Sequence, residues 1–219
     1  MAETVLMISS RNYSSWSLRG WLLARMSGID FTTTTIVGAG AEAARQELLM
    51  RTSSTLVPCL IYDSIEVWDT LAIAEFLNEI APKAGMYPKE RAARARCRSI
   101  AGEMHSGFGA LRSSLPMNLR SRRPGFKLWS GARADVDRIT AVWRDCLIKS
   151  GGPWLFGDQY SVADAMFAPV ACRFVSYDVS LDPFSAAYRD RTLARPDMQE
   201  WTRLALDETE EVPELDVEF

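Results

Sequence analysis

All of the strand-forming segments of this chain lie within its first third, which limits the folds open to it. Each is short and bounded by turn residues, as buried strands are. They are Thr4–Ser9, Phe31–Val37 and the pair Leu60–Tyr62 and Glu66–Trp68 around a turn at Asp63-Ser64. Beyond Pro88 the apolar residues recur with helical spacing. The pattern therefore predicts a small sheet followed by an all-helical region.

Helical segments separate these strands. Trp16–Ser27 ends at Gly28, Ala41–Met50 follows a break at Gly38–Gly40, and Thr70–Ile80 places its apolar residues close to one stripe. The resulting order is β-α-β-α-β-β-α. A β-α-β unit followed by a hairpin and a helix predicts an α/β domain, with a mixed sheet covered by helices.

The segment Ala81–Pro88 marks a change of organisation, because it holds two prolines and a glycine. We place an α/β domain at 1–82 and an all-α domain at 83–219, with 83–90 as the linker. Helices are expected at Arg91–Leu115, Arg133–Ser150, Ser161–Tyr177 and Arg195–Leu206. The acidic tail Asp207–Phe219 is expected to be a solvated terminus.

Composition excludes several classes of function. The net charge of −3 favours neither nucleic acid nor an anionic membrane, and no apolar run is long enough to span a bilayer. The start of the chain lacks the pattern of a signal peptide, so a cytoplasmic location is expected. The four cysteines are widely spaced and are interpreted as reduced core thiols. A single histidine, His105, excludes a His-rich metal site, and no metal is expected.

Val57-Pro58 directly precedes the third strand, at a position that suits a residue without a backbone donor. With a cis bond, the amide and carbonyl of Val57 would point outward, and an extended peptide could dock against them. A trans proline that merely begins the strand is the commoner alternative.

Asp69-Thr70 precedes the helix that starts at Leu71. Either residue is a good N-cap. A helix N-terminus also binds a carboxylate, and a neighbouring aspartate can hold an ammonium group. The pair therefore suits the zwitterionic end of an amino acid, with simple capping as the alternative.

The segment Tyr13-Ser14-Ser15-Trp16-Ser17 joins the first strand to the first helix. Ligands of α/β domains tend to bind at the carboxyl ends of strands. A serine hydroxyl there could donate to a bound thiolate, which the helix dipole would also favour. The alternative is that Ser15 or Ser17 simply caps the helix. We expect one serine to cap and another to face a pocket.

These segments occur in the order seen in cytosolic glutathione transferases, which the chain resembles over nearly its whole length. The match includes Trp68–Leu77 and Gly157–Asp164, where Ser161 and Asp164 have the spacing of a capping box. The resemblance implies a thioredoxin-like N-terminal domain, glutathione as co-substrate, a homodimer and a role in detoxification. In the family the proline is cis and the residue before it pairs with the cysteinyl backbone of glutathione. The implied binding residues are Val57, Pro58, Asp69 and Thr70, of which the last two grip the γ-glutamyl end.

Ser14-Ser15 also resembles the serine-serine-cysteine motif of the zeta class, and the match continues in Arg19 and Gly28–Phe31. In that class the first serine activates the thiol. The resemblance therefore implies Ser14 as the catalytic residue, with Ser15 as second choice. Trp16 stands where zeta enzymes have cysteine.

In this fold the electrophile lies between the domains, against the first long helix of the helical half. The expected lining residues are Trp16, Met104, His105, Phe108, Arg112 and Met117. His105 is either a polar anchor or a satisfied interfacial side chain. Arg112 and Arg120 could attract an anionic substrate, whereas Arg122 and Arg123 are expected to belong to a solvated face.

Four functions remain open from the sequence. The leading hypothesis is a transferase that joins glutathione sulfur to a small electrophile. The others are a cis-trans isomerase of the maleylacetoacetate type, a thiol-disulfide reductase and a non-catalytic glutathione-binding protein. No cysteine lies at the serine loop, which argues against the reductase.

Overall fold

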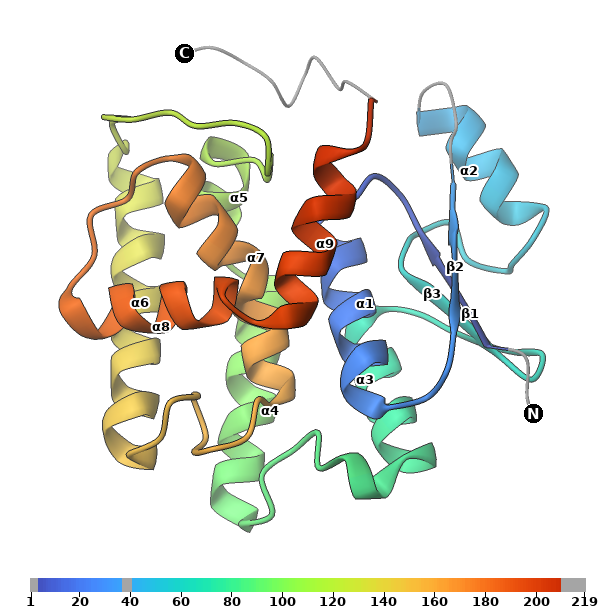
Figure 1. Ribbon diagram of the computed structural model, residues 1–219, viewed down its shortest axis with the longest axis horizontal. Helices are drawn as coiled ribbons and strands as arrows, with labels where there is room; N and C mark the ends of the chain where they lie inside the picture. Colours follow the sequence, from blue (N-terminus) through green and yellow to red (C-terminus); the bar gives the residue numbers. More distant parts are fainter. Residues whose placement is uncertain (1–3, 37–40, 210–219) are drawn as a thin grey trace.

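The computed structural model describes residues 4–36 and 41–209. The predicted break at Gly38–Gly40 and the tail beyond Thr209 lie outside these residues. A small sheet with its helices lies beside a larger group of helices, and α1 (Ser15–Ser27) runs between the two halves (Figure 1).

The sheet has the mixed topology that the sequence predicts. Its strands are β1 (Thr4–Ile8), β2 (Thr32–Thr35), β3 (Cys59–Tyr62) and β4 (Ile65–Val67), in the order β2-β1-β3-β4. β1 pairs parallel with β2, placing Val5 opposite Thr32, and antiparallel with β3, placing Leu6 opposite Leu60. The parallel pair follows from the crossover through α1, since parallel neighbours cannot be joined by a tight turn.

The two faces of β1 pack against different helices because side chains alternate along a strand. Leu6 and Ile8 belong to the main core, together with residues of α1 and α3 (Thr70–Ile80). Met7 points the other way and clusters with Leu48 of α2 (Ala41–Leu49). The sheet is thus enclosed between α1 and α3 on one face and α2 on the other (Figure 1).

After a short 3₁₀ turn at Pro82–Ala84, the described part of the second half is helical. α7 is its central helix, with all but one of its residues buried. The helices are α4 (Arg91–Ser106), α5 (Gly109–Ser114), α6 (Ser130–Ser150), α7 (Val162–Ser176), α8 (Pro183–Leu193) and α9 (Pro196–Leu206).

The expectation of one helix over Arg91–Leu115 is wrong, since α4 stops at Ser106. Gly107 has an extended backbone and donates its N–H to Glu103 O at 2.8 Å. Phe108 then adopts a left-handed conformation with φ of 61°, which an α-helix cannot accommodate. The chain restarts as α5, so the turn at Gly107-Phe108 re-aims the segment that follows.

α8 was not predicted. Its start carries ordinary signals, because Pro183 occupies the first turn and Asp182 accepts from the amides of Phe184 and Ser185 at 3.0 and 3.2 Å. The predicted capping box of α7 is confirmed. Asp164 Oδ2 accepts from the Ser161 amide at 2.8 Å, and Oδ1 from the Tyr188 hydroxyl at 2.9 Å.

The four cysteines are free and buried, as expected. Burial raises the pKa of the Cys59 thiol to about 11 and the pKa values of Cys97 and Cys172 to about 12. These thiols are therefore protonated at neutral pH. Their environment does not suit the thiolate chemistry of a disulfide reductase.

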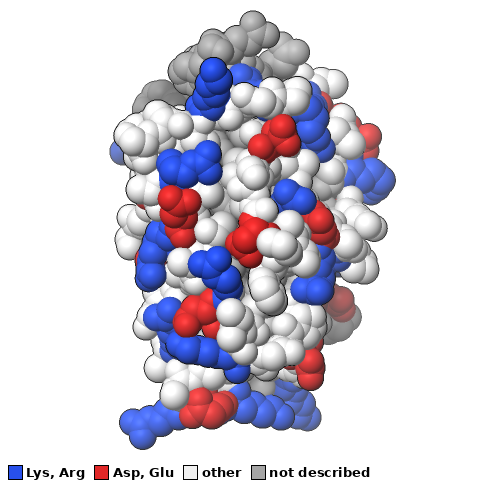
Figure 2. All heavy atoms as spheres, turned by 90° about the vertical axis from the view of Figure 1, so that its left-hand side faces the viewer, with Lys and Arg blue, Asp and Glu red and all other residues white. Residues whose placement is uncertain are grey.

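The outer face of the helical half carries both signs of charge, interspersed over its surface (Figure 2). Ion pairs account for part of this pattern, including Arg138 with Glu103 and Lys149 with Asp145. Among the described residues, no helix combines the length and apolar character that crossing a bilayer requires.

Gly20, in the middle of α1, lies directly against Pro58. A Cβ added at Gly20 would lie 2.5 Å from the Cβ of Pro58. Gly20→Ala should therefore lower the free energy of unfolding, by about 1–3 kcal/mol, because a buried proline cannot rotate away. Urea denaturation measures this.

Gly102→Ala in α4 is the matched control. A Cβ at Gly102 meets nothing within 4 Å, so only the helix propensity changes. This variant should gain about 0.5–1 kcal/mol. Equal effects of the two substitutions would contradict the close approach of α1 to Pro58.

Candidate functional site

Ser14 is the N-cap of α1. Its Oγ accepts from the Ser17 amide at 3.1 Å, and its extended backbone (φ −87°, ψ 97°) places its carbonyl to accept from Leu18. The alternative in which Ser15 or Ser17 caps the helix is therefore wrong. A hydroxyl that accepts in a cap keeps its proton for another partner. The half-buried Ser14 can thus cap the helix and donate to a ligand.

The other two serines face inward. Ser15 is buried, and its Oγ accepts from Arg173 at 3.3 Å. Ser17 Oγ accepts from the Ser9 amide at 3.0 Å, which ties the start of α1 to the end of β1. Of the two predicted catalytic serines, Ser14 is the more accessible.

The Val57-Pro58 bond is cis, as the family resemblance implies, and the trans alternative is wrong. Pro58 is buried and Val57 is half-buried. The contact of Pro58 with Gly20 brings this turn against α1, the helix that Ser14 caps. A second cis bond, Trp68-Asp69, lies before α3 and was not foreseen.

Asp69 caps α3 and also reaches the helical half. Its Oδ1 accepts from the Leu71 amide at 2.9 Å, and its Oδ2 lies 2.8 Å from Nε2 of His105. The Asp69 side chain is 47% exposed, so it remains open to a further partner. Thr70 differs: it is fully buried, and its Oγ1 has no hydrogen-bond partner among the described residues.

His105 and Trp16 join the N-terminal ends of α1 and α3. Their rings approach edge to face, with centroids 5.1 Å apart. The guanidinium carbons of Arg19 and Arg112 each lie 4.7 Å from the Trp16 ring centroid, in cation–π contact. Arg112 is held by carbonyls at the end of α4, including Gly107 O at 3.1 Å. His105 is thus a polar contact between the domains.

Three arginines make this region cationic. Burial, with the charges of Arg112 and Arg173, holds the pKa of Arg19 well below its ordinary value. Burial likewise lowers the pKa of Arg173 to about 10, and lowers that of Arg112. In the described part of the chain none of the three forms an ion pair with a carboxylate. An anion bound nearby would offset their mutual repulsion.

Sequence reasoning did not identify Arg173 as part of the site. The sequence does mark Arg173 as unusual, since it is the only charged residue between Ala165 and Phe174. Two of its nitrogens, Nε and Nη1, are buried without a partner among the described residues. Buried guanidinium groups are normally paired, so this position is costly and calls for an explanation.

Three of the predicted lining residues belong to the core instead. Met104, Phe108 and Met117 are at most 7% exposed and pack within the main apolar cluster. Buried in this way, the three side chains offer little surface to a substrate. The predicted residues that keep some surface at the site are Trp16, His105 and Arg112.

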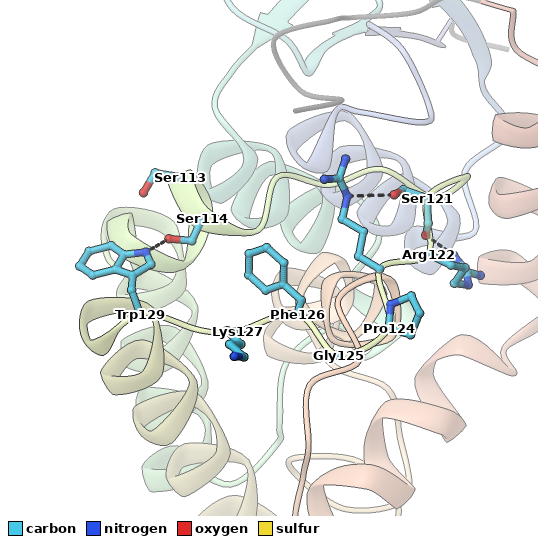
Figure 3. A pocket seen from close by; sticks show the side chains of 10 residues that line it. Ser113, Ser114, Ser121, Arg122, Pro124, Gly125, Phe126, Lys127 and Trp129 are labelled. Atoms are coloured by element: carbon cyan, nitrogen blue, oxygen red, sulfur yellow. Dashed lines mark hydrogen bonds between the residues drawn. The ribbon is translucent and has the colours of Figure 1, made fainter. Parts of the chain in front are cut away.

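A cavity of about 980 Å³ lies between the end of α5 and the segment leading to α6 (Figure 3). It includes none of the predicted lining residues. Arg122 and Arg123, expected to be merely solvated, contribute to its wall. The lining residues are Ser113, Ser114, Ser121, Arg122, Arg123, Pro124, Gly125, Phe126, Lys127 and Trp129.

The cavity combines cationic and aromatic groups. Arg123 Nε donates to Ser121 Oγ at 3.1 Å. The Trp129 indole donates to Ser114 Oγ (Figure 3). Within residues 4–36 and 41–209, no three His, Cys, Asp or Glu side chains gather into a group that could hold a metal ion.

Comparison with known proteins gives the family. A model described as the N-terminal domain of glutathione S-transferase matches residues 13–80, and one described as its C-terminal domain matches 91–205. The "Probable maleylacetoacetate isomerase" of Caenorhabditis elegans is 26% identical over 187 residues, covering 84% of this chain and 85% of that protein. The "Maleylacetoacetate isomerase" of Rattus norvegicus is 26% identical over 184 residues, covering 83% of each.

Solved structures show the same fold. A glutathione transferase homolog from Burkholderia, crystallised with glutathione, aligns with a TM-score of 0.71 at 23% identity and covers 95% of this chain and 100% of that one. A theta class glutathione S-transferase from Xanthomonas axonopodis pv. citri, also with glutathione bound, aligns with a TM-score of 0.67 at 20% identity and covers 92% and 98% of the two chains.

The uncompensated charge at Arg173 gives a test of this geometry. Arg173→Met keeps an extended side chain and removes the unpaired donors. It should raise the free energy of unfolding by about 1 kcal/mol or more, measured by urea denaturation, because a buried unpaired charge costs more than a buried thioether.

Arg133→Met provides the control, since Arg133 is exposed on α6. Its effect should stay within about 0.5 kcal/mol. If Arg173→Met destabilises the protein more than the control does, the Arg173 guanidinium has favourable partners and the account of an unpaired charge is wrong.

Proposed function

The chain belongs to the glutathione S-transferase family, and from this premise we propose that it binds glutathione and joins its sulfur to a small electrophile. In this proposal Val57 and Pro58 hold the cysteinyl backbone of glutathione. Asp69 and Thr70 hold its γ-glutamyl end, and Ser14 donates a hydrogen bond to its sulfur.

One observation carries the proposal: the ends of α1 and α3 meet at His105. Nε2 of His105 lies 2.8 Å from Asp69 Oδ2, and its ring packs on Trp16, two residues from Ser14. A carboxylate for an ammonium group and a hydroxyl for a thiolate therefore lie in one region. An extended tripeptide suits such a pair of anchors, because its amino acid end and its thiol are several bonds apart.

Thiol activation would rest on three local effects. The Ser14 hydroxyl donates to the sulfur, and the N-terminus of α1 favours a negative charge. Arg112 and the buried Arg19 and Arg173 add positive potential. The thiol proton leaves to water. The thiolate then forms a bond to the electrophilic carbon, and the leaving group departs with the electrons of the broken bond.

Asp69 would divide its two oxygens between two partners. Oδ1 is used by the helix cap, whereas Oδ2 is shared with His105. An ammonium group of glutathione would bind the exposed side of the same carboxylate. The buried hydroxyl of Thr70 would reach the ligand only after local movement.

The second substrate would lie against Trp16, His105 and Arg112, where the three side chains keep some exposure. The indole offers a flat apolar surface, and Arg112 favours an electrophile that carries a negative group.

The second candidate is a glutathione-dependent cis-trans isomerase of the maleylacetoacetate type. The names of the worm and rat relatives favour it. In that chemistry the thiolate adds to a double bond, the resulting single bond rotates, and the thiolate leaves unchanged. Trp16 argues against it, because its indole fills the place that cysteine occupies in the zeta motif and is held by Arg19 and Arg112.

We also propose a cytoplasmic homodimer with a role in detoxification, as is usual in the family. Large apolar side chains exposed on the first half support an interface there. Leu56 is 65% exposed and Trp68 is 42% exposed. A partner chain that covered them would bury this apolar surface.

Ser14→Ala should raise the pKa of the bound glutathione thiol and lower kcat/KM for a chloronitrobenzene substrate by about a hundredfold, since a donor aimed at the developing charge is lost. Ser15→Ala should have a smaller effect, because Ser15 is buried. The thiolate absorbance of the complex, followed against pH, measures the shift.

Asp182→Ala is the matched control, because it also removes a helix cap, but at α8. Both variants should lose about 1 kcal/mol of stability, and only Ser14→Ala should change the thiol. A normal thiol pKa in the complex with Ser14→Ala would disprove the role of Ser14.

The two candidate activities separate in a direct assay. The proposed transferase should conjugate glutathione to the aromatic electrophile and convert a maleyl substrate slowly, because Trp16 stands where zeta enzymes have cysteine. Faster turnover of the maleyl substrate, dependent on glutathione, would establish the isomerase. Binding of glutathione without either reaction would establish a non-catalytic protein.

A further inference from the structure

The loop between β1 and α1 is held in place by the last described residues of the chain. Glu208 follows α9, and its carboxylate reaches this loop across the two halves of the molecule. Oε1 accepts from the Arg11 amide at 2.8 Å, while Oε2 accepts from the Ser10 hydroxyl at 2.8 Å and from the Asn12 amide at 3.1 Å. The sequence predicts that Glu208 belongs to a solvated terminus. For Glu208 this prediction is wrong, because its carboxylate is bonded to the loop.

The carboxylate organises more of the loop than it touches. Because Ser10 gives its proton to Glu208, its Oγ lone pairs face the amides of Asn12 and Tyr13, at 3.2 and 3.3 Å. The Arg11 guanidinium lies 3.5 Å from Oε1 and partly balances the negative charge. One side chain thus orients the amides of three successive residues, directly or through Ser10.

Other contacts brace the same loop without replacing these bonds. Asn12 Oδ1 accepts from the amides of Leu119 and Arg120 at 2.8 and 3.1 Å. The Trp201 indole donates to Arg11 O at 3.0 Å. These bonds use the Asn12 side chain and a carbonyl. The amides of Arg11 and Asn12 depend on Glu208 for a charged acceptor.

The loop leads directly to the proposed thiol activator. The Ser14 amide donates to Ser10 O at 3.0 Å, so Ser10 is bonded to Glu208 through its hydroxyl and to Ser14 through its carbonyl. A shift of Ser10 would move the cap of α1 and the direction of the Ser14 hydroxyl. Hydrogen bonds to an ionised carboxylate are strong, and their loss would leave several donors without an acceptor.

We propose that Glu208 is a positioning residue, which holds the β1–α1 loop so that Ser14 points at the sulfur of bound glutathione. This inference rests on the proposed function. It assigns the C-terminal end of α9 to the thiol site, where neither the sequence nor the family match places it.

The test compares Glu208→Ala and Glu208→Gln with Asp207→Asn in the full chain. Asp207 is the adjacent residue, is exposed and pairs only with Arg203 on its own helix among the described contacts. Glu208→Gln keeps the shape of the side chain but turns an NH₂ group toward the donors of the loop. Three quantities are measured: the pKa of the bound glutathione thiol, kcat/KM for the aromatic electrophile, and amide hydrogen exchange at residues 10–14.

Both Glu208 variants should raise the thiol pKa by about one unit and lower kcat/KM on the order of tenfold to a hundredfold, since a small displacement of Ser14 weakens its bond. Exchange at residues 10–14 should become faster. Asp207→Asn should match the unmodified protein in all three. If the Glu208→Ala variant does not fold, Glu208→Gln alone is compared with Asp207→Asn.

Faster exchange with an unchanged thiol pKa would overturn the proposal, because Glu208 would then brace the loop without affecting the sulfur. An unchanged exchange rate would overturn it as well. Failure of the proposed function would give a different result. The unmodified protein itself would bind no glutathione in calorimetry, and the positioning role would then be disproved as well.

Discussion

The position of α1 between the two halves of the molecule is the constraint on which the rest of the structure depends. One side of this helix lies against the sheet, where Gly20 approaches Pro58 and Leu6, and another side packs against α7. The fully buried Arg19 joins them, because its Nε donates to Met166 O of α7 at 2.8 Å. The N-terminus of α1 is thereby fixed where the two halves meet. Ser14 caps it, Trp16 and His105 connect it to Asp69, and the loop before it is tied to Glu208.

This arrangement buries positively charged side chains, which lowers the stability of the fold. Arg19 and Arg173 are both buried; one nitrogen of Arg19 and two of Arg173 lack partners among the described residues. A core designed only for stability would use apolar side chains at these positions. Beside the proposed thiolate site, the same charges would favour the reactive state. The cost in stability and the gain in function would then have a common origin, as is frequent at active sites.

Much of the fold follows from local pattern, whereas the details of the site do not. β1 and α3 were predictable because Leu6, Met7 and Ile8 alternate between two apolar faces and Ile73 and Leu77 form a stripe. Ser14 could not be separated from Ser15 and Ser17 as the cap, since all three serines suit it and the choice depends on one backbone conformation. The break in the helix at Gly107 could not be predicted, because the left-handed conformation of Phe108 has no sequence signal. Arg173 and Glu208 act through partners 158 and about 197 residues away, and such contacts are invisible to local spacing.

The central claim is that glutathione binds across the ends of α1 and α3 with its sulfur at Ser14. A crystal structure of the protein with glutathione measures this directly. The account predicts the sulfur within about 3.5 Å of Ser14 Oγ, the cysteinyl backbone paired with Val57, and the γ-glutamyl ammonium group on Asp69. Glutathione bound elsewhere, or with its sulfur directed away from Ser14, would contradict the account.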